Sequence, residues 1–223
     1  MAQNLTAPQR AIVAEYWWRR AASEITSWVG WQHVLEDLRA EGSPGTVLKL
    51  AERAVHDEYQ HAVWCRDWAE RFGHQGGEVR PRGDERFAFP DATDSDNRIC
   101  RIALCCFTET VGCFTLQQVR PLVRDPALRK LNRRHLADEM QHSRTGWAHL
   151  STLDVHGRES LRRYLPRLLA LLPRVCCGRA GEEHEDLVPF GYFTARVLTS
   201  AHDEAVRSVI LPGLEHLKLA EAS

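Results

Sequence analysis

Two short segments, DEYQH at Asp57–His61 and DEMQH at Asp138–His142, decide the fold. Each contains Glu-x-x-His, which places a carboxylate and an imidazole about one turn apart on the same face of a helix. Two such helices facing each other, together with one glutamate from each of two further helices, form the two-metal carboxylate site of a four-helix bundle. Glu24 and Glu109 lie in the helical segments that precede the two motifs. The sequence therefore predicts an all-α fold around a buried metal pair.

Turn and capping signals divide the chain into six expected helices. Gly42–Gly45 separates the first helix from the second, a Gly-, Pro- and Arg-rich loop at 73–94 separates the second from the third, and Asp125 can cap a fourth that begins at Pro126. No sustained period-two alternation indicates a strand. The expected helices span about residues 8–40, 46–72, 95–120, 126–153, 159–172 and 192–210, and Pro212 breaks the last one.

The first four helices are expected to form the core bundle, at about residues 11–153, within a single domain of residues 1–223. The first helix pairs with the second and the third with the fourth, because their connections are short, and the long loop crosses between the two pairs. The two additional C-terminal helices are expected to pack outside this bundle.

Composition argues against several classes of protein. Lys and Arg total 29 against 30 Asp and Glu, and this balance argues against a nucleic-acid partner. No apolar run approaches the roughly 20 residues of a membrane span, and the N-terminus lacks the apolar core of a signal peptide, so a cytoplasmic protein with no membrane partner is expected. The seven cysteines are an odd number without a Cys-x-x-Cys motif, and we interpret them as reduced thiols.

Six side chains are the predicted metal ligands: Glu24, Glu58, His61, Glu109, Glu139 and His142. Iron accepts both carboxylates and imidazoles, and four glutamates balance the charge of two divalent ions, which helps a buried site. Glu15 and Glu36 are alternatives to Glu24 on the first helix but lie nearer its ends. Asp57 and Asp138 are predicted to accept a hydrogen bond from the far ring nitrogen of the ligand histidines, across the helix pair.

His135 is a seventh candidate ligand, because His135, Glu139 and His142 lie at i, i+4 and i+7 on one helix face. The full set, Glu24, Glu58-x-x-His61, Glu109 and His135-x-x-x-Glu139-x-x-His142, resembles the p-aminobenzoate N-oxygenase family of ferritin-like di-iron enzymes, which adds a third histidine at this spacing. The resemblance implies oxidation of an aromatic amine with molecular oxygen at two irons. No flavin or iron–sulfur motif is visible, so an external electron donor is expected, and a manganese–iron pair is left open.

The chain also resembles the broader di-iron monooxygenases, in which a cysteine follows the histidine of the second helix by four residues, as Cys65 does. A threonine often follows the third-helix glutamate by four residues, and Cys113 stands there instead. Both thiols are expected to face the site, and Gly146 is expected to leave space beside His142. These three residues are therefore predicted to line the pocket.

The favoured function is a di-iron oxygenase that acts on a small organic molecule, by preference through N-oxygenation of an amine. A ferritin-like ferroxidase or iron-storage subunit would use the same ligands. A tRNA-modifying di-iron hydroxylase would also use them, and the basic run from Arg120 to Arg134 is the only indication of such a partner. A homodimer is compatible with the sequence.

Overall fold

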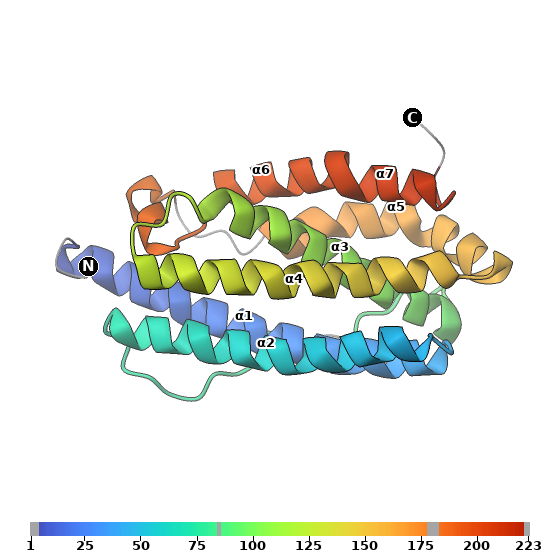
Figure 1. Cartoon of the computed structure of the whole chain (residues 1–223), viewed down its shortest axis with the longest axis horizontal. Helices are drawn as coiled ribbons and strands as arrows, with labels where there is room; N and C mark the ends of the chain where they lie inside the picture. The colour runs from blue at the N-terminus through green and yellow to red at the C-terminus, as the bar shows by residue number, and fades with distance from the viewer. Residues whose placement is uncertain (1–4, 84–85, 178–182, 221–223) are drawn as a thin grey trace.

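A computed structural model of the chain describes residues 5–83, 86–177 and 183–220, which are all-helical and contain no strand. The all-α prediction is therefore confirmed. Four long helices run side by side along the long axis of the molecule (Figure 1). They are α1 (Ala7–Ala40), α2 (Gly45–Arg71), α3 (Asp94–Val119) and α4 (Pro126–Thr152).

Local sequence determines where these helices begin. Thr6 caps α1 by accepting a hydrogen bond from the backbone N–H of Gln9, whose side chain bonds back to the cap, and α3 begins in the same way at Thr93. Asp125 accepts hydrogen bonds from backbone N–H groups in the first turn of α4, where Pro126 needs no N–H partner. Because such caps are local, the expected ends of the four long helices differ from the observed ones by one residue at most.

Helix α1 packs on α2, α3 packs on α4, and the two pairs meet through α1–α3 and α2–α4 contacts. Apolar side chains fill separate stretches of this bundle. Trp17 and Trp68 belong to one buried cluster, and Trp31 and Leu38 belong to another. Glu24 lies midway between Trp17 and Trp31 on α1, so the polar ligand candidates form a layer between two apolar clusters.

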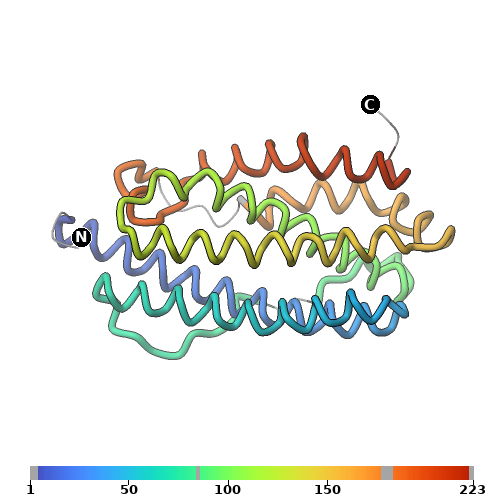
Figure 2. Tube along the Cα trace, viewed as in Figure 1, coloured from blue at the N-terminus to red at the C-terminus, as the bar shows by residue number. Residues whose placement is uncertain are grey.

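The C-terminal part packs along α3. It consists of α5 (Val155–Cys177), the 3-10 helix η2 (Glu185–Phe190), α6 (Ala195–Ala205), the π-helical turn η3 (Val206–Ile210) and α7 (Leu211–His216). In Figure 2 the α5 and the α6–α7 rods lie together on the side of α3 opposite to α2. Helix α5 is longer than expected and continues through Pro166 and Pro173. Both prolines are exposed, whereas the leucines facing α3 are fully buried, and this burial compensates for the missing backbone hydrogen bonds.

The expectation that Pro212 ends the last helix is wrong. The chain passes from α6 through η3 into α7 and remains helical to His216. Pro212 lies in the first turn of α7, directly after the π-helical turn. A π-turn changes the local hydrogen-bond register, so the missing N–H of a proline at this position costs little.

The expectation that no apolar run is long enough to cross a membrane does not hold for α3. Among the described helices, α3 alone meets that criterion by length and composition, and 61% of its most apolar window is buried inside the molecule. Contacts with α1, α4, α5 and α6 account for this burial, since α3 is covered on several sides.

Candidate metal centre

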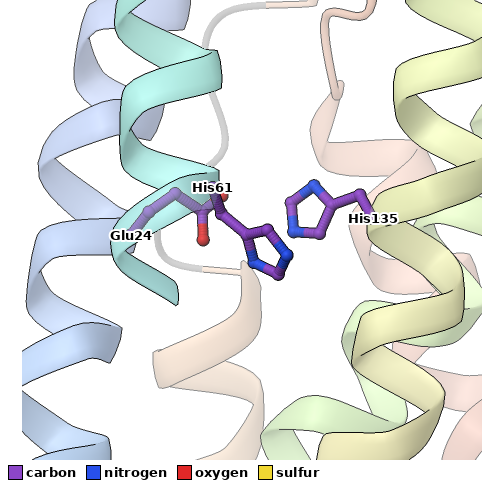
Figure 3. Close-up of side chains that lie close together, drawn as sticks. All are labelled: Glu24, His61 and His135. Carbon is purple, nitrogen blue, oxygen red and sulfur yellow. The ribbon is translucent and has the colours of Figure 1, made fainter. Parts of the chain in front are cut away.

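The structure brings all seven predicted ligands to the middle of the bundle, in two groups. Within each group, one ligand atom from every side chain lies within 4.8 Å of the others. The first group is Glu24, His61 and His135, and the second is Glu58, Glu109, Glu139 and His142. Figure 3 shows the first group, in which the rings of His61 from α2 and His135 from α4 face each other beside the carboxylate of Glu24 from α1.

Glu58 and Glu139 each direct one oxygen toward each group. Glu139 Oε1 lies 2.7 Å from His135 Nε2, and its Oε2 lies 3.6 Å from His142 Nδ1. Glu58 Oε1 lies 2.9 Å from His142 Nδ1, and its Oε2 lies 3.7 Å from His61 Nδ1. A carboxylate with this orientation is suited to bind two metal ions at once, so the glutamates of the two Glu-x-x-His motifs would be the residues able to serve both groups.

The two motif histidines are oriented in the same way. Each turns Nδ1 toward the cluster and Nε2 toward an aspartate on the opposite helix. His61 Nε2 lies 3.4 Å from Asp138 Oδ2, and His142 Nε2 lies 3.6 Å from Asp57 Oδ2. Arg53 approaches both aspartates, at 3.2 Å from Asp57 and 3.7 Å from Asp138. The structure thus places Asp57 and Asp138 where they can fix the ring orientation of the histidines.

Replacing Asp138 by Asn is expected to weaken metal binding about 10- to 100-fold, because a carboxylate that accepts from a ligand histidine both orients the ring and strengthens its donor nitrogen. The measurement is a competitive titration of Fe(II) or Co(II) with a chelator. Asp67→Asn, half-exposed on α2 and paired with Arg66 at 3.2 Å, is the control. Equal affinities for the two variants would contradict this role for Asp138.

The donor atoms of the cluster are buried and lack ordinary partners. His61, Glu58 and His142 are 0%, 1% and 2% exposed. Among the described residues, no hydrogen-bond partner of suitable geometry is found for four atoms that face the cluster: Glu58 Oε1, Glu139 Oε2, His61 Nδ1 and His142 Nδ1. A buried polar atom without a partner costs about 1–3 kcal/mol. Divalent metal ions would remove this cost, so the residues present fit a metal pair.

Burial and mutual repulsion shift the titration of the metal-free cluster. Burial raises the pKa of Glu24 to about 7 and that of Glu109 to about 8. Burial alone would lower the pKa of His61, but the carboxylates of Asp138 and Glu58 outweigh it and raise the value to about 10. The surrounding carboxylates likewise raise the pKa of His142 against the effect of burial. Protons thus occupy the cluster when metal does not.

The metal-free protein is expected to lose stability as the pH rises from about 7 to 8.5. In this range the folded protein holds more protons on Glu24, His61, Glu109 and His142 than the unfolded chain does, because all four pKa values are raised by folding. The free energy of unfolding then falls by about 1.4 kcal/mol per pH unit for each excess proton. Urea unfolding with a chelator present measures the slope. Glu109→Gln should reduce this slope. A free energy of unfolding that rises with pH over this range would contradict the raised pKa values.

A cavity of about 1010 Å³ adjoins the cluster. Its walls come from α1, α3, α4, the loop residues 82 and 87–89 and the C-terminal part, and they include the ligand candidates Glu24, Glu109, His135 and Glu139. Gly112 also lines the cavity, and a Cβ built there would lie 3.7 Å from Glu139 Oε2, so this glycine packs beside the carboxylate. The arrangement gives a small molecule direct access to the ligands.

None of the three residues predicted to line the pocket is part of the cavity wall. Cys65 is buried with Sγ 3.8 Å from Glu24 Oε1, so its thiol donates toward a ligand carboxylate instead. Burial raises the pKa values of Cys65 and Cys113, which keeps both thiols protonated. Gly146 does not leave space beside His142, because it packs tightly against Cys106 of α3.

Two residues at the site were not predicted from the sequence. Trp31 donates a hydrogen bond from Nε1 to Glu109 Oε1 at 2.9 Å and thereby orients this ligand. Arg20 lines the cavity between the rings of Trp17 and Phe193, and its Nη1 is buried without a partner among the described residues. Their spacing was a usable signal, since Arg20, Glu24 and Trp31 lie at i, i+4 and i+11 and therefore share one face of α1.

The alternative ligands on α1 belong to neither ligand group. Glu15 is half-exposed and pairs with Arg19 at 2.9 Å, and Glu36 pairs with Arg86 at 2.9 Å. Glu24 is the glutamate of α1 that reaches the metal-ligating group, and its side chain is 12% exposed. Comparison of the chain with protein-family models, with curated proteins and with solved structures finds no match.

Proposed function

We propose that this protein is a ferritin-like di-iron oxygenase that oxidises a small aromatic amine, with N-oxygenation as the favoured reaction. The observation that carries the proposal is the pair of glutamates, Glu58 and Glu139, each of which faces both ligand groups beside a cavity large enough for an organic molecule. The reaction converts R–NH2, O2, two electrons and two protons into R–NHOH and water. A bound iron pair would supply the oxygen chemistry.

The protein's own side chains have three tasks in this proposal. Four glutamates and three histidines would hold the ions, with a donor set of carboxylates and imidazoles that suits iron or a manganese–iron pair. Asp57, Asp138 and Trp31 orient ligands through hydrogen bonds and ion pairs. The residues that line the cavity would position the substrate beside Gly112.

Metal analysis and product analysis test the proposal together. Protein loaded anaerobically with Fe(II) should retain about two ions per chain. After reduction, it should consume oxygen in the presence of an aromatic amine and yield the hydroxylamine. A chain that retains no iron, or that oxidises iron without consuming the amine, would overturn the proposal. Loading with manganese and iron together identifies which pair supports turnover.

A ferroxidase is a weaker candidate, because a storage protein has no use for a large apolar-walled cavity beside its metal ligands. The two functions differ in assembly as well, since a ferritin-like shell contains many subunits whereas an oxygenase does not require them. Size-exclusion chromatography with light scattering therefore distinguishes them: a large hollow assembly that accumulates iron would favour storage.

Arg20 is expected to select substrates that carry an acidic group. Its guanidinium lies at the cavity wall and has one buried nitrogen without a partner, while the other approaches Glu24 at 3.5 Å. A carboxylate on the substrate would meet that nitrogen at low effective dielectric. Arg20→Gln should raise KM for an aminobenzoate about tenfold or more and leave KM for an uncharged aniline within about twofold. Equal changes for both substrates would contradict this role.

A further inference from the structure

The outer face of α4 carries only positive charge. Five basic side chains are exposed there: Arg129, Lys130, Arg133, Arg134 and Arg144. The two acidic residues of α4, Asp138 and Glu139, are both buried. These five basic residues form the α4 basic face. In Figure 1, α4 runs across the front of the molecule, beside α2.

The α4 basic face lacks compensating carboxylates. Within residues 5–83, 86–177 and 183–220, none of its five cations forms an ion pair. Exposed basic groups on α1 and α2 behave differently: Arg19 pairs with Glu15 and Arg39 pairs with Glu52, each at 2.9 Å. The net charge of the chain is -1 at pH 7, so the excess on α4 is a local feature. A one-sign surface of this kind attracts an oppositely charged partner.

Trp64 connects this face to the candidate metal centre. The indole is half-buried, and the guanidinium carbon of Arg134 lies 4.6 Å from its ring centroid. On its inner side, the Trp64 ring lies 5.2 Å from the ring of His61 and 6.4 Å from the ring of His135. One aromatic side chain therefore spans the distance between the α4 basic face and two candidate ligands.

The buried cluster needs such a connection. Its ligands are almost completely enclosed, and the reaction proposed above consumes two electrons that the chain cannot supply by itself. We propose that the α4 basic face docks an acidic one-electron carrier protein and that Trp64 is the relay from this carrier to His61 and His135. The inference rests on the proposed di-iron function. Each reduced carrier gives up one electron and leaves oxidised, so two successive encounters supply the two electrons of one turnover.

This partner fits the surface better than a nucleic acid does. Electron-transfer complexes are small, weak and governed by charge, which suits five cations on one helix face. A relay residue beside Arg134 has a purpose for an electron carrier and none for RNA. The same surface makes RNA the natural competitor in the test.

The binding test uses iron-loaded protein, whose metal content is measured first, and a strongly acidic [2Fe–2S] ferredoxin as the probe. The docking variant is Arg129→Gln, Lys130→Gln, Arg133→Gln, and Arg134 is retained because it packs on Trp64. The control variant neutralises three exposed basic residues elsewhere: Lys49→Gln, Arg163→Gln, Arg207→Gln. At low salt, the Kd for ferredoxin should be about tenfold or more higher for the docking variant than for the wild type. For the control variant it should rise about twofold at most. High salt should weaken the wild-type complex to a similar degree.

The relay is tested in the preformed complex by stopped-flow spectroscopy. Trp64→Leu should leave Kd and iron content unchanged and slow reduction of the bound iron by reduced ferredoxin at least tenfold. Reduction by dithionite, a small molecule that does not depend on the docking face, should keep its wild-type rate. Trp64→Tyr should restore most of the ferredoxin-dependent rate, which a purely structural role would not require.

Each negative outcome has a separate meaning. A chain that holds no iron refutes the proposed function itself. The α4 basic face is refuted as the docking site if iron-loaded protein oxidises an amine with a chemical reductant but binds ferredoxin no better than the docking variant does. Preferential binding of a tRNA over ferredoxin at equal salt would also refute it and would assign the surface to RNA.

Discussion

Replacing Glu139 by Gln is expected to reduce bound iron from about two ions per chain to fewer than one. Both oxygens of Glu139 lie at the cluster, one 2.7 Å from His135 Nε2 and the other 3.6 Å from His142 Nδ1, so the loss of its charge affects both groups of ligands. An amide has a neutral oxygen and cannot bridge two cations as a carboxylate does. Metal analysis after anaerobic loading measures the effect, and Glu52→Gln, exposed on α2, is the control.

The same substitution should stabilise the metal-free protein. The charge of Glu139 is one of the causes that raise the pKa of Glu109 to about 8, after burial. Removal of one carboxylate from the cluster lessens this repulsion, so urea unfolding of the metal-free variant at pH 8 should show a higher free energy of unfolding. A variant that lost both iron and stability would indicate a structural role for Glu139, and retention of two ions would exclude it as a bridging ligand.

Gly146→Ala is expected to destabilise the fold by about 3 kcal/mol or more. A Cβ built on Gly146 would lie 2.2 Å from the Cβ and 2.9 Å from the Cα of Cys106, so the obstacle is the backbone of α3 and cannot move aside as a flexible side-chain tip could. The two helices would have to separate next to Thr110, whose hydroxyl hydrogen-bonds Ser143 at 2.8 Å. Chemical unfolding of the purified variant measures the loss.

Gly30→Ala is the matched control for this substitution. Gly30 is also in the middle of a long helix, but among the described residues no atom outside its chain neighbours and the adjacent helix backbone lies within 4 Å of a Cβ built there. Alanine in a helix interior is favoured over glycine by about 0.5–1 kcal/mol, so Gly30→Ala should be neutral or stabilising. If the two variants lost similar amounts of stability, close packing of α3 on α4 at Gly146 would be excluded.

The long helices and the convergence of the seven candidate ligands could be predicted because their signals are local. Capping at Thr6, Thr93 and Asp125 depends on residues within one turn, and the two Glu-x-x-His motifs determine their own helix face. Burial of the apolar face of each helix then brings the motifs together, since this face is stable only when it points into the bundle. The choice of Glu24 over Glu15 and Glu36 followed from its position in the middle of α1.

The pocket could not be predicted in the same way. Spacing places Cys65 and Cys113 on inward faces, but the cavity lies between α1, α3, α4 and the C-terminal part, and its outline depends on how residues 87–89 pack. The role of Gly146 depends on the distance between α3 and α4, which no periodicity specifies. Sequence signals likewise misplaced the ends of α5 and the end of the last expected helix, which continues to His216, because tertiary packing outweighs proline there.

The exchanged histidine–aspartate contacts between α2 and α4 reveal an approximate internal two-fold symmetry. The α1–α2 hairpin contributes one glutamate and one Glu-x-x-His motif, and so does the α3–α4 hairpin. This symmetry is broken four residues before each motif, where α4 carries His135 and α2 carries the buried Ala54. One half of the centre therefore offers an extra nitrogen donor, and two chemically identical ions bound there would differ in redox potential, so that one of them would accept an incoming electron first.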